Sequence, residues 1–370
     1  MATRYRIGFA MEQNLGHATH YRNLVRYVAE DAQVTPVWMP IPFEPTGLMK
    51  ALPLVRGNWS ARASLLARRA ADRARREARL DALFFHTQVT SLLVGGLMRA
   101  IPTIVSLDAT PINYDSVGQF YEHQSGGALE RLKFRANVRA FTLAAHLVSW
   151  CQWAKDSLIA DYGVPAEKIT VIPPGVDLAL WPKRAPALHA AGGQPLKLLF
   201  VGGDFKRKGG EVLLDCFKRH FQECCELHLV TQAPIPPEKN LFVYNGVKPN
   251  SETLTRLFAE ADVFVFPTLA DCAPVAVTEA MAATMPVITT RVGAIPEAIQ
   301  DGKNGLIVEA GSVEDLRRAI ETLLAQPQLR LEMGQLGRKR AEAEYDARHN
   351  ARRLLEIIKV TACRPSGRSD

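Results

Sequence analysis

The sequence predicts an α/β protein built from two doubly wound domains. Short apolar runs alternate with longer helical patterns along the chain, which is typical of parallel sheets covered by helices. The chain has 370 residues, more than a single hydrophobic core usually accommodates. A segment rich in Pro, Gly and Ala, residues 183–195, separates two sets of apolar runs and predicts an interdomain linker.

Each apolar run is expected to form one strand. In the first domain, residues 1–182, the predicted strands are Tyr5–Ala10, Val34–Met39, Ala82–Phe85, Pro102–Ser106, His146–Trp150 and Ile169–Ile172. In the second domain they are Leu196–Val201, Glu226–Val230, Leu241–Tyr244, Asp262–Phe266, Pro286–Thr290 and Gly305–Val308.

Composition is that of an ordinary soluble protein, with 47% hydrophobic and 22% charged residues. We find no secretory apolar region, because Arg4 and Arg6 lead directly into the first strand, and no apolar run long enough to span a bilayer. The six cysteines show no metal-site or disulfide-framework spacing. We therefore expect a cytoplasmic protein with reduced thiols.

The segment from Asp262 to Val308 carries the strongest functional signal. Its first strand ends at Pro267, and the following loop contains Asp271. Pro274 suits the first turn of a helix that brings in Glu279. Two carboxylates thus flank a helix start at the carboxyl end of a parallel strand, where ligands bind in open α/β sheets and where free amides favour anions.

This segment resembles the nucleotide-sugar half of retaining glycosyltransferases of family 4, also called group 1 glycosyl transferases. The family signature Glu-x7-Glu is present as Asp271-x7-Glu279, followed by Ala280-Met281-Ala282 and the Pro286-Val287 strand. The segment Gly293–Val308 resembles the next loop, helix and strand, and Ile169–Trp181 resembles the strand and loop before the linker.

The resemblance implies the GT-B fold, two Rossmann-like domains facing across a cleft. Residues 1–182 would then form the acceptor-side domain and residues 196–349 the nucleotide-sugar-binding domain. A helix at 350–361 would cross back to the first domain, and the polar residues 362–370 are expected to be disordered.

A basic loop follows the first strand of the second domain, within Leu198–Phe217. It begins at Gly202-Gly203 and leads through Arg207 and Lys208 into a helix at Gly210 or Glu211. The family resemblance assigns Lys208 to the donor diphosphate. Members usually have an arginine where this chain has Gly203, so Arg207 could supply that charge, or the role could be missing. The loop lacks the sequence of a P-loop or of a dinucleotide fingerprint. We expect the side chain of Lys208 to be exposed in this loop.

The first domain offers further candidates at the ends of its strands. Gly16 follows the first strand and precedes a helix expected to begin near Ala18, and the family brings this turn close to donor phosphates or acceptor. The neighbouring His17 and His20 could touch substrate, although packing roles are favoured.

Asp108 occupies the place of a family histidine near the reaction centre. It could bind a sugar hydroxyl or act as an acid or base, or it could simply be a turn acid beside Thr110-Pro111. Asp115 lies nearby, and His86 is a weaker candidate.

The resemblance implies transfer of a sugar from a nucleoside-diphosphate-sugar with retention of configuration. Lys208, Arg207 and the amides near Pro274, Val275 and Ala276 would neutralise the leaving diphosphate. Glu279 would accept hydrogen bonds from the ribose hydroxyls, and Asp271 would face the transferred sugar. Asp271 is shorter than the usual Glu, and Pro274 lacks the amide of the usual glycine, so the sugar is not readable. No metal and no cofactor is expected.

The acceptor is unidentified, and a lipid-linked one would suit the basic segment Asn58–Leu80. This segment has seven arginines, two acids and scattered apolar residues, so it could contact the anionic inner face of a membrane. A solvated surface helix is the favoured alternative, and nucleic acid is not expected. Two rival functions stay open: a nucleotide-sugar epimerase of the same fold, and a non-catalytic nucleotide-sugar-binding module.

Overall fold

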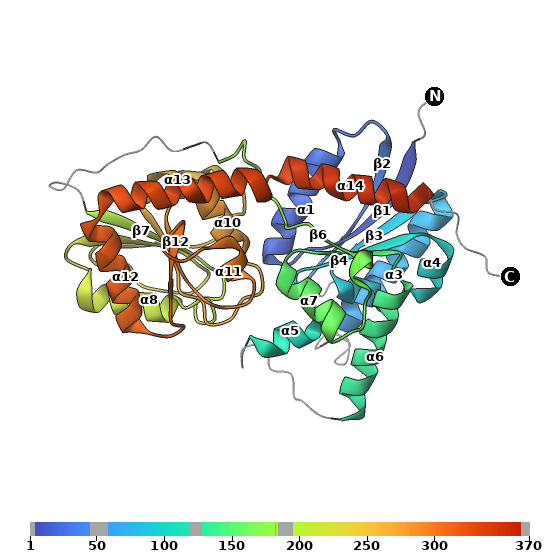
Figure 1. Ribbon diagram of the computed structural model, residues 1–370, viewed down its shortest axis with the longest axis horizontal. Coiled ribbons are helices and arrows are strands. Elements are labelled where there is room, and N and C mark those ends of the chain that lie inside the picture. Colours follow the sequence, from blue (N-terminus) through green and yellow to red (C-terminus); the bar gives the residue numbers. More distant parts are fainter. Residues whose placement is uncertain (1–3, 45–57, 118–126, 182, 184–194, 364–370) are drawn as a thin grey trace. The chain divides into compact units, whose positions relative to one another are not determined.

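The computed structural model describes residues 4–44, 58–117, 127–181, 183 and 195–363. These residues form two compact units, each with its own sheet (Figure 1). Unit 1 contains β1–β6 with α1, α3, α4, α6, α7 and α14, and unit 2 contains β7–β12 with α8–α13. The predicted α/β class is therefore confirmed.

Both sheets have six parallel strands. In unit 1 they are β1 (Tyr5–Glu12), β2 (Val34–Ile41), β3 (Ala82–His86), β4 (Thr103–Leu107), β5 (His146–Ser149) and β6 (Ile169–Val171). In unit 2 they are β7 (Leu196–Val201), β8 (Cys225–Val230), β9 (Leu241–Tyr244), β10 (Val263–Phe266), β11 (Val287–Thr290) and β12 (Gly305–Val308). All the predicted strands are present, and their ends differ from the predicted ones by two residues or fewer.

Strand order defines one topological switch point in each sheet. The orders are β2-β1-β3-β4-β5-β6 and β12-β11-β10-β7-β8-β9. The chain therefore moves outward in one direction from β1 and β7, and then returns to fill the other side. The switch points lie between β1 and β3 in unit 1 and between β7 and β10 in unit 2, and ligands of doubly wound sheets bind at such points.

The helices cover both faces of the sheets. Those of the first half are α1 (Leu15–Val28), α3 (Trp59–Glu77), η2 (Gln88–Ser91), α4 (Gly95–Ala100), α5 (Pro111–Ser116), α6 (Ala128–Leu143), α7 (Gln152–Ala160) and η4 (Ala166–Lys168). Those of the second half are α8 (Gly210–His220), α9 (Glu252–Glu260), α10 (Val275–Ala282), α11 (Ile295–Ala298), α12 (Val313–Ala325), α13 (Pro327–Glu344) and α14 (Ala347–Cys363).

Unit 1 has a hydrophobic core on each face of its sheet. Leu24 and Val28 of α1 share one core with Leu354 and Ile358 of α14, so the C-terminal helix lies beside the N-terminal one (Figure 1). The opposite core contains the alanines of α3 with residues of α4, α6 and α7. Strands such as β3 are buried along their whole length, because helices on both faces exclude water.

Several predicted boundaries shift in the structure. The first helix begins at Leu15 rather than near Ala18, so Gly16 lies inside its first turn. Pro274 is the N-cap of α10 and not its first residue. The C-terminal helix begins at Ala347 and includes Ala362 and Cys363, which were expected in the tail. Nearly all of the predicted linker and the rest of that tail lie outside the described residues.

The basic segment folds as α3, whose N-cap Asn58 accepts a hydrogen bond from the Ala61 amide. Arg62 is buried, with its guanidinium over the Trp59 ring and donating to the Phe43 carbonyl. The other six arginines of the segment are exposed. Among the described residues, no helix combines the length and apolar character that crossing a bilayer requires.

Candidate active site

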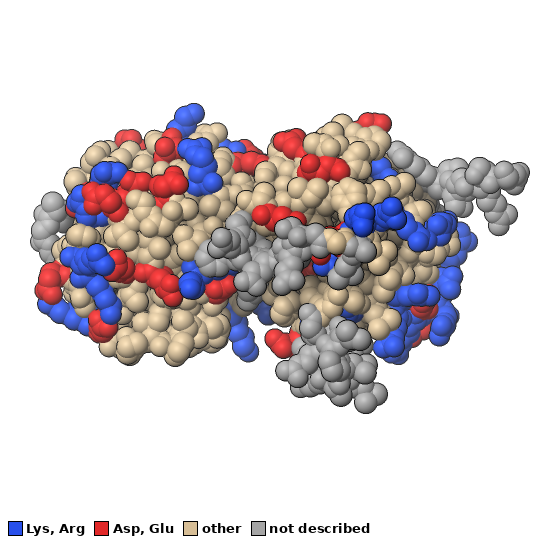
Figure 2. All heavy atoms as spheres, turned by 90° about the horizontal axis from the view of Figure 1, so that it is seen from below, with Lys and Arg blue, Asp and Glu red and all other residues tan. Residues whose placement is uncertain are grey.

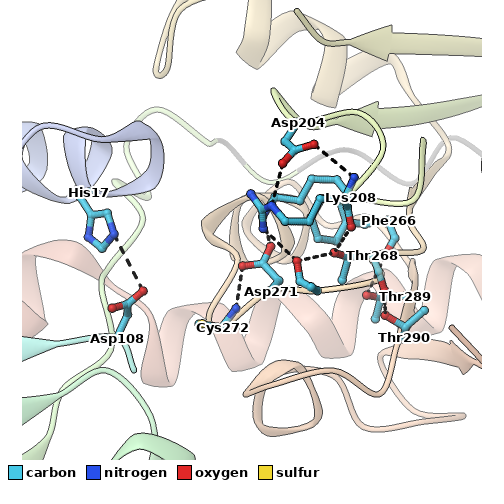
Figure 3. A network of polar contacts seen from close by, with 12 residues as sticks. His17, Asp108, Asp204, Lys208, Phe266, Thr268, Asp271, Cys272, Thr289 and Thr290 are labelled. Carbon is cyan, nitrogen blue, oxygen red and sulfur yellow. Dashed lines mark hydrogen bonds and ion pairs between the residues drawn. The ribbon is translucent and has the colours of Figure 1, made fainter. Parts of the chain in front are cut away.

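The switch point of unit 2 brings together two of the residues that the sequence singled out. Lys208 follows β7, and Asp271 follows β10, the strand that pairs with β7. The ammonium group of Lys208 donates directly to Oδ2 of Asp271 (Figure 3). Both side chains are largely buried, with 14% and 10% exposed. Residues separated by 63 positions in the sequence thus form one ion pair.

Burial changes what Lys208 can do. The structure contradicts the expectation of an exposed loop lysine, since the side chain lies against Asp271 and over the Phe266 ring. Burial lowers the pKa of Lys208 from its usual value, Asp271 opposes that shift, and Arg207 adds to it. A preorganised cation with little hydration is a strong partner for negative charge that develops nearby.

Arg207 ties the two site loops together. Its Nε donates to Oδ2 of Asp204 at 2.8 Å and its Nη1 to the Ala270 carbonyl at 2.9 Å. In return, its carbonyl accepts from the Leu269 amide at 2.9 Å and from the Thr268 hydroxyl at 3.2 Å. These bonds join the loop after β7 to the loop after β10, and so hold Lys208 beside Asp271.

Two glycines allow this close approach of backbones. Gly209 has φ +75°, and a Cβ there would lie 1.9 Å from the Pro267 carbonyl oxygen. Gly293 has φ +54°, and its Cβ would lie 2.3 Å from the Asp271 carbonyl oxygen. Any larger residue would combine a strained backbone conformation with a steric clash. The loops around the Lys208–Asp271 pair are therefore tightly packed against each other.

Helix α10 begins next to Asp271 and carries Glu279. Its first turn contains Val275 and Ala276, both half-buried, and first-turn amides have no partner within the helix. Glu279 is buried, and this burial raises the pKa of its carboxyl group from 4.5 to about 7. Gly203, at the start of the loop after β7, is exposed. The unit therefore offers a cation, a helix start and a carboxyl group around one switch point.

The switch point of unit 1 gathers a different set of residues. His17, in the first turn of α1, has its Nδ1 2.7 Å from Nε2 of His86, the last residue of β3. Its Nε2 lies 3.9 Å from Oδ2 of Asp108, directly after β4 (Figure 3). The remaining sequence candidates here are Gly16, which is half-buried beside His17, and His20, which is buried.

Sequence reasoning named these residues one by one but did not group them. It favoured packing roles for His17 and His20, ranked His86 low, and missed Trp150, whose ring contacts all three histidines. The predicted strands could have grouped these residues, because His86, Asp108 and Trp150 all stand at or just after the ends of neighbouring predicted strands. In unit 2, Asp204 and Thr268 were missed because their contacts depend on loop geometry.

Metal-binding clusters of three or more His, Cys, Asp or Glu side chains are not found in the part of the chain that the structure describes.

Two family models match the chain. One, described as "Glycosyltransferase Family 4", matches residues 16–180, and the other, "Glycosyl transferases group 1", matches residues 195–326. Together they match part of each unit and include every candidate residue named above.

Among curated proteins, a "D-inositol 3-phosphate glycosyltransferase" of Paenarthrobacter aurescens is 26% identical over 219 residues, or 54% of each chain. The chain spans about half the length of the first curated relatives it matches.

Among solved structures, sucrose-phosphate synthase of Thermosynechococcus elongatus aligns with a TM-score of 0.76 at 16% identity, covering 96% of this chain and 99% of that one. Anabaena HepE, solved "in complex with UDP and glucose", aligns with a TM-score of 0.70 at 14% identity, covering 96% and 99%. At these identities the likeness shows the shared fold.

Proposed function

Because the chain belongs to glycosyltransferase family 4, we propose that it transfers a sugar, with retention of configuration, from a nucleoside-diphosphate-sugar to a hydroxyl-bearing acceptor. The observation that carries this proposal is the buried Lys208–Asp271 pair at the switch point of unit 2, next to the start of α10. A donor with a diphosphate leaving group needs a fixed positive charge at that place. HepE, which shares the fold, was solved with UDP, so uridine nucleotides are the first to test.

Each candidate site residue of unit 2 has a role in this proposal. Lys208 stabilises the diphosphate as it leaves, aided by the amides of Val275 and Ala276 at a helix start. Gly203 lets the backbone approach the phosphates, and Pro274 shapes the turn before them. Asp271 contacts the transferred sugar, and Glu279 accepts hydrogen bonds from the ribose hydroxyls.

The role of Arg207 stays a prediction. Two of its guanidinium nitrogens already bond Asp204 and the Ala270 carbonyl. Its charge adds to the field at the diphosphate, while its bonds position Lys208.

Retention is proposed to follow a front-face path. The acceptor oxygen bonds to the anomeric carbon on the side from which the diphosphate departs, and the electron pair of the broken bond goes to the phosphate oxygen. That oxygen then takes the acceptor's proton, so no protein nucleophile is needed.

On this proposal unit 1 holds the acceptor, with Gly16 close to it or to the donor phosphates and Asp108 at its hydroxyl. Independence from metals and cofactors, and a cytoplasmic location, stay predictions.

We propose an anionic membrane surface as a further partner of the protein, contacted through α3. Arg68, Arg69, Arg75 and Arg76 are exposed, and Figure 2 shows basic side chains gathered on one flank of unit 1. Trp59, Leu66 and Ala70 of the same helix pack against the core of unit 1, so contact with lipid would rely on charge. Such contact would suit a lipid-linked acceptor, as in the synthesis of glycolipids or polysaccharides.

The function is tested by thermal unfolding with UDP-, GDP- and ADP-sugars, followed by turnover assays on the donor that stabilises. A ligand at 100 times its dissociation constant adds ~2.7 kcal/mol to stability. We expect stabilisation by one nucleotide class, and release of nucleoside diphosphate that depends on acceptor. Interconversion of donor sugars without acceptor would instead identify an epimerase. Binding without any turnover or donor hydrolysis would identify a non-catalytic module.

A further inference from the structure

The imidazole cluster of unit 1, defined as His17, His20, His86 and Trp150, stands at the carboxyl edge of neighbouring strands. His17 follows β1, His86 ends β3 and Trp150 follows β5 directly, while Asp108 follows β4, and these strands are adjacent in the order β1-β3-β4-β5. The cluster and Asp108 therefore line the switch point between β1 and β3, where a doubly wound sheet binds its ligand.

Aromatic packing fixes the position of His86. Its ring stacks on Trp150, with centroids 4.9 Å apart and planes at 11°, and it has no exposed surface. His20 meets both rings edge-on, at centroid distances of 5.1 Å. A ring enclosed in this way cannot turn, so its 2.7 Å contact with Nδ1 of His17 holds the His17 ring in one orientation.

The contact with His86 uses only one ring nitrogen of His17, Nδ1, so its other nitrogen, Nε2, can bond a ligand. Burial first, and the neighbouring His17 and His20 second, lower the pKa of His86 well below its usual value, so its ring is neutral. The His17–His86 contact shares one proton, whichever ring donates. Nε2 of His17 is thus the nitrogen that faces Asp108, at 3.9 Å. This separation exceeds a direct hydrogen bond, but one hydroxyl could bond both groups.

We propose that His17 and Asp108 together bind the reacting hydroxyl of the sugar acceptor, and that His86 and Trp150 are positioning residues for His17. The inference deepens the proposed function, on which it rests. A hydroxyl both donates and accepts, so it can give its hydrogen to the carboxylate of Asp108 while its oxygen accepts a hydrogen bond from Nε2 of His17. The carboxylate of Asp108 would repel a phosphate, so this pair suits the hydroxyl of a sugar or cyclitol.

The direct test follows the histidine rings by NMR, with myo-inositol and D-glucose as hydroxyl probes and ring-labelled histidine in the full chain. We expect a saturable shift of the His17 signal, lost in Asp108→Asn and in His86→Phe, which keeps a ring on Trp150 but cannot bond His17. The control signal is His146, which begins β5 at the opposite edge and contacts the Thr170 hydroxyl. A His17 signal unmoved by both probes would overturn the proposal.

Turnover separates this inference from the proposed function. We expect His17→Gly to lower sugar transfer to whichever hydroxyl probe shifts the His17 signal by about 100-fold, the usual effect of misplacing a reacting group, with partial rescue by added imidazole. Affinity for nucleoside diphosphate should stay unchanged, whereas the thermal midpoint should fall because glycine is unfavourable in a helix. His146→Gln should bind nucleoside diphosphate and transfer sugar like wild type. Normal turnover in His17→Gly would defeat the hydroxyl assignment alone, whereas wild-type protein that binds no nucleotide would defeat the proposed function.

Discussion

The two switch points occupy the same place in two similar sheets, yet they present different chemistry. Between β7 and β10, unit 2 places the buried ion pair of Lys208 and Asp271. Between β1 and β3, unit 1 places the contact of His17 with a neutral His86, with Asp108 nearby. The topology provides the location, and the residues after each strand decide whether it suits an anion or a hydroxyl.

The comparison also separates two consequences of burial. Lys208 keeps a carboxylate partner that offsets part of its loss of hydration, whereas burial holds His86 in its neutral form. Glu279 resembles the histidines in this respect, because burial raises its pKa towards neutrality. Variants of these groups should therefore affect pH dependence, turnover and binding in distinct ways.

The largest expected effect concerns Glu279 and the pH dependence of stability. Burial raises its pKa from 4.5 to about 7, so the fold favours the neutral acid. That stabilisation is complete below pH 4.5 and is lost as pH rises through 7. We expect wild type to lose up to about 3 kcal/mol relative to Glu279→Gln over this range. Urea unfolding of both proteins at pH 5 and pH 8 measures it, and parallel pH profiles would refute it.

A slightly smaller effect is expected at the cation of unit 2. Lys208→Ala should lower turnover by ~100-fold or more, because a preorganised charge is lost from the leaving diphosphate. It should also lower stability, because Asp271 loses its buried partner. Lys206→Ala is the matched control, since Lys206 is exposed in the same loop. A near-normal rate in Lys208→Ala would move the stabilisation of the diphosphate to another group, with Arg207 the next to test.

Loss of the ribose contact should weaken nucleotide binding without affecting unit 1. Glu279→Ala is expected to cost ~1 to 3 kcal/mol of binding free energy, the value of charged hydrogen bonds. Calorimetry with UDP, GDP and ADP measures this loss, and His17→Ala should bind like wild type. If affinity is unchanged in a folded Glu279→Ala protein, Glu279 does not contact the ribose.

The smallest effect per residue is expected on α3. Each basic residue near an anionic surface adds ~1 kcal/mol, which salt screens. The wild-type protein should sediment with anionic vesicles at low salt and release at high salt, while replacement of Arg68, Arg69, Arg75 and Arg76 by Gln should abolish binding and spare nucleotide affinity. Equal sedimentation with neutral and anionic vesicles, or none with either, would leave α3 as a solvated helix.

Sequence patterns predicted the strands well because buried parallel strands are continuous apolar runs. The strand Val263–Phe266, for example, is apolar and fully buried, as strands of parallel sheets covered by helices on both faces usually are. Lys208 and Asp271 could be named from their motif, but their mutual contact depends on backbones brought together by Gly209 and Gly293. No local pattern encodes such a contact.

The unit 1 cluster was harder to predict for a related reason. His17, His86 and Trp150 are far apart in sequence, and each alone is compatible with ordinary packing. Only the strand order places them at one edge. The same holds for Arg62, which belongs to the arginine-rich run but is buried against Trp59.

The most direct test of the account is hydrogen exchange of the full chain with and without a saturating nucleoside diphosphate, using UDP, GDP and ADP in turn. We predict protection of the loop from Gly203 to Gly210 and of the start of α10, near Val275 and Ala276, by one of the three nucleotides. The amides around His86 and Asp108 should exchange as in the free protein. Protection confined to these unit 1 segments, or none with any nucleotide, would contradict the assignment of the donor to unit 2.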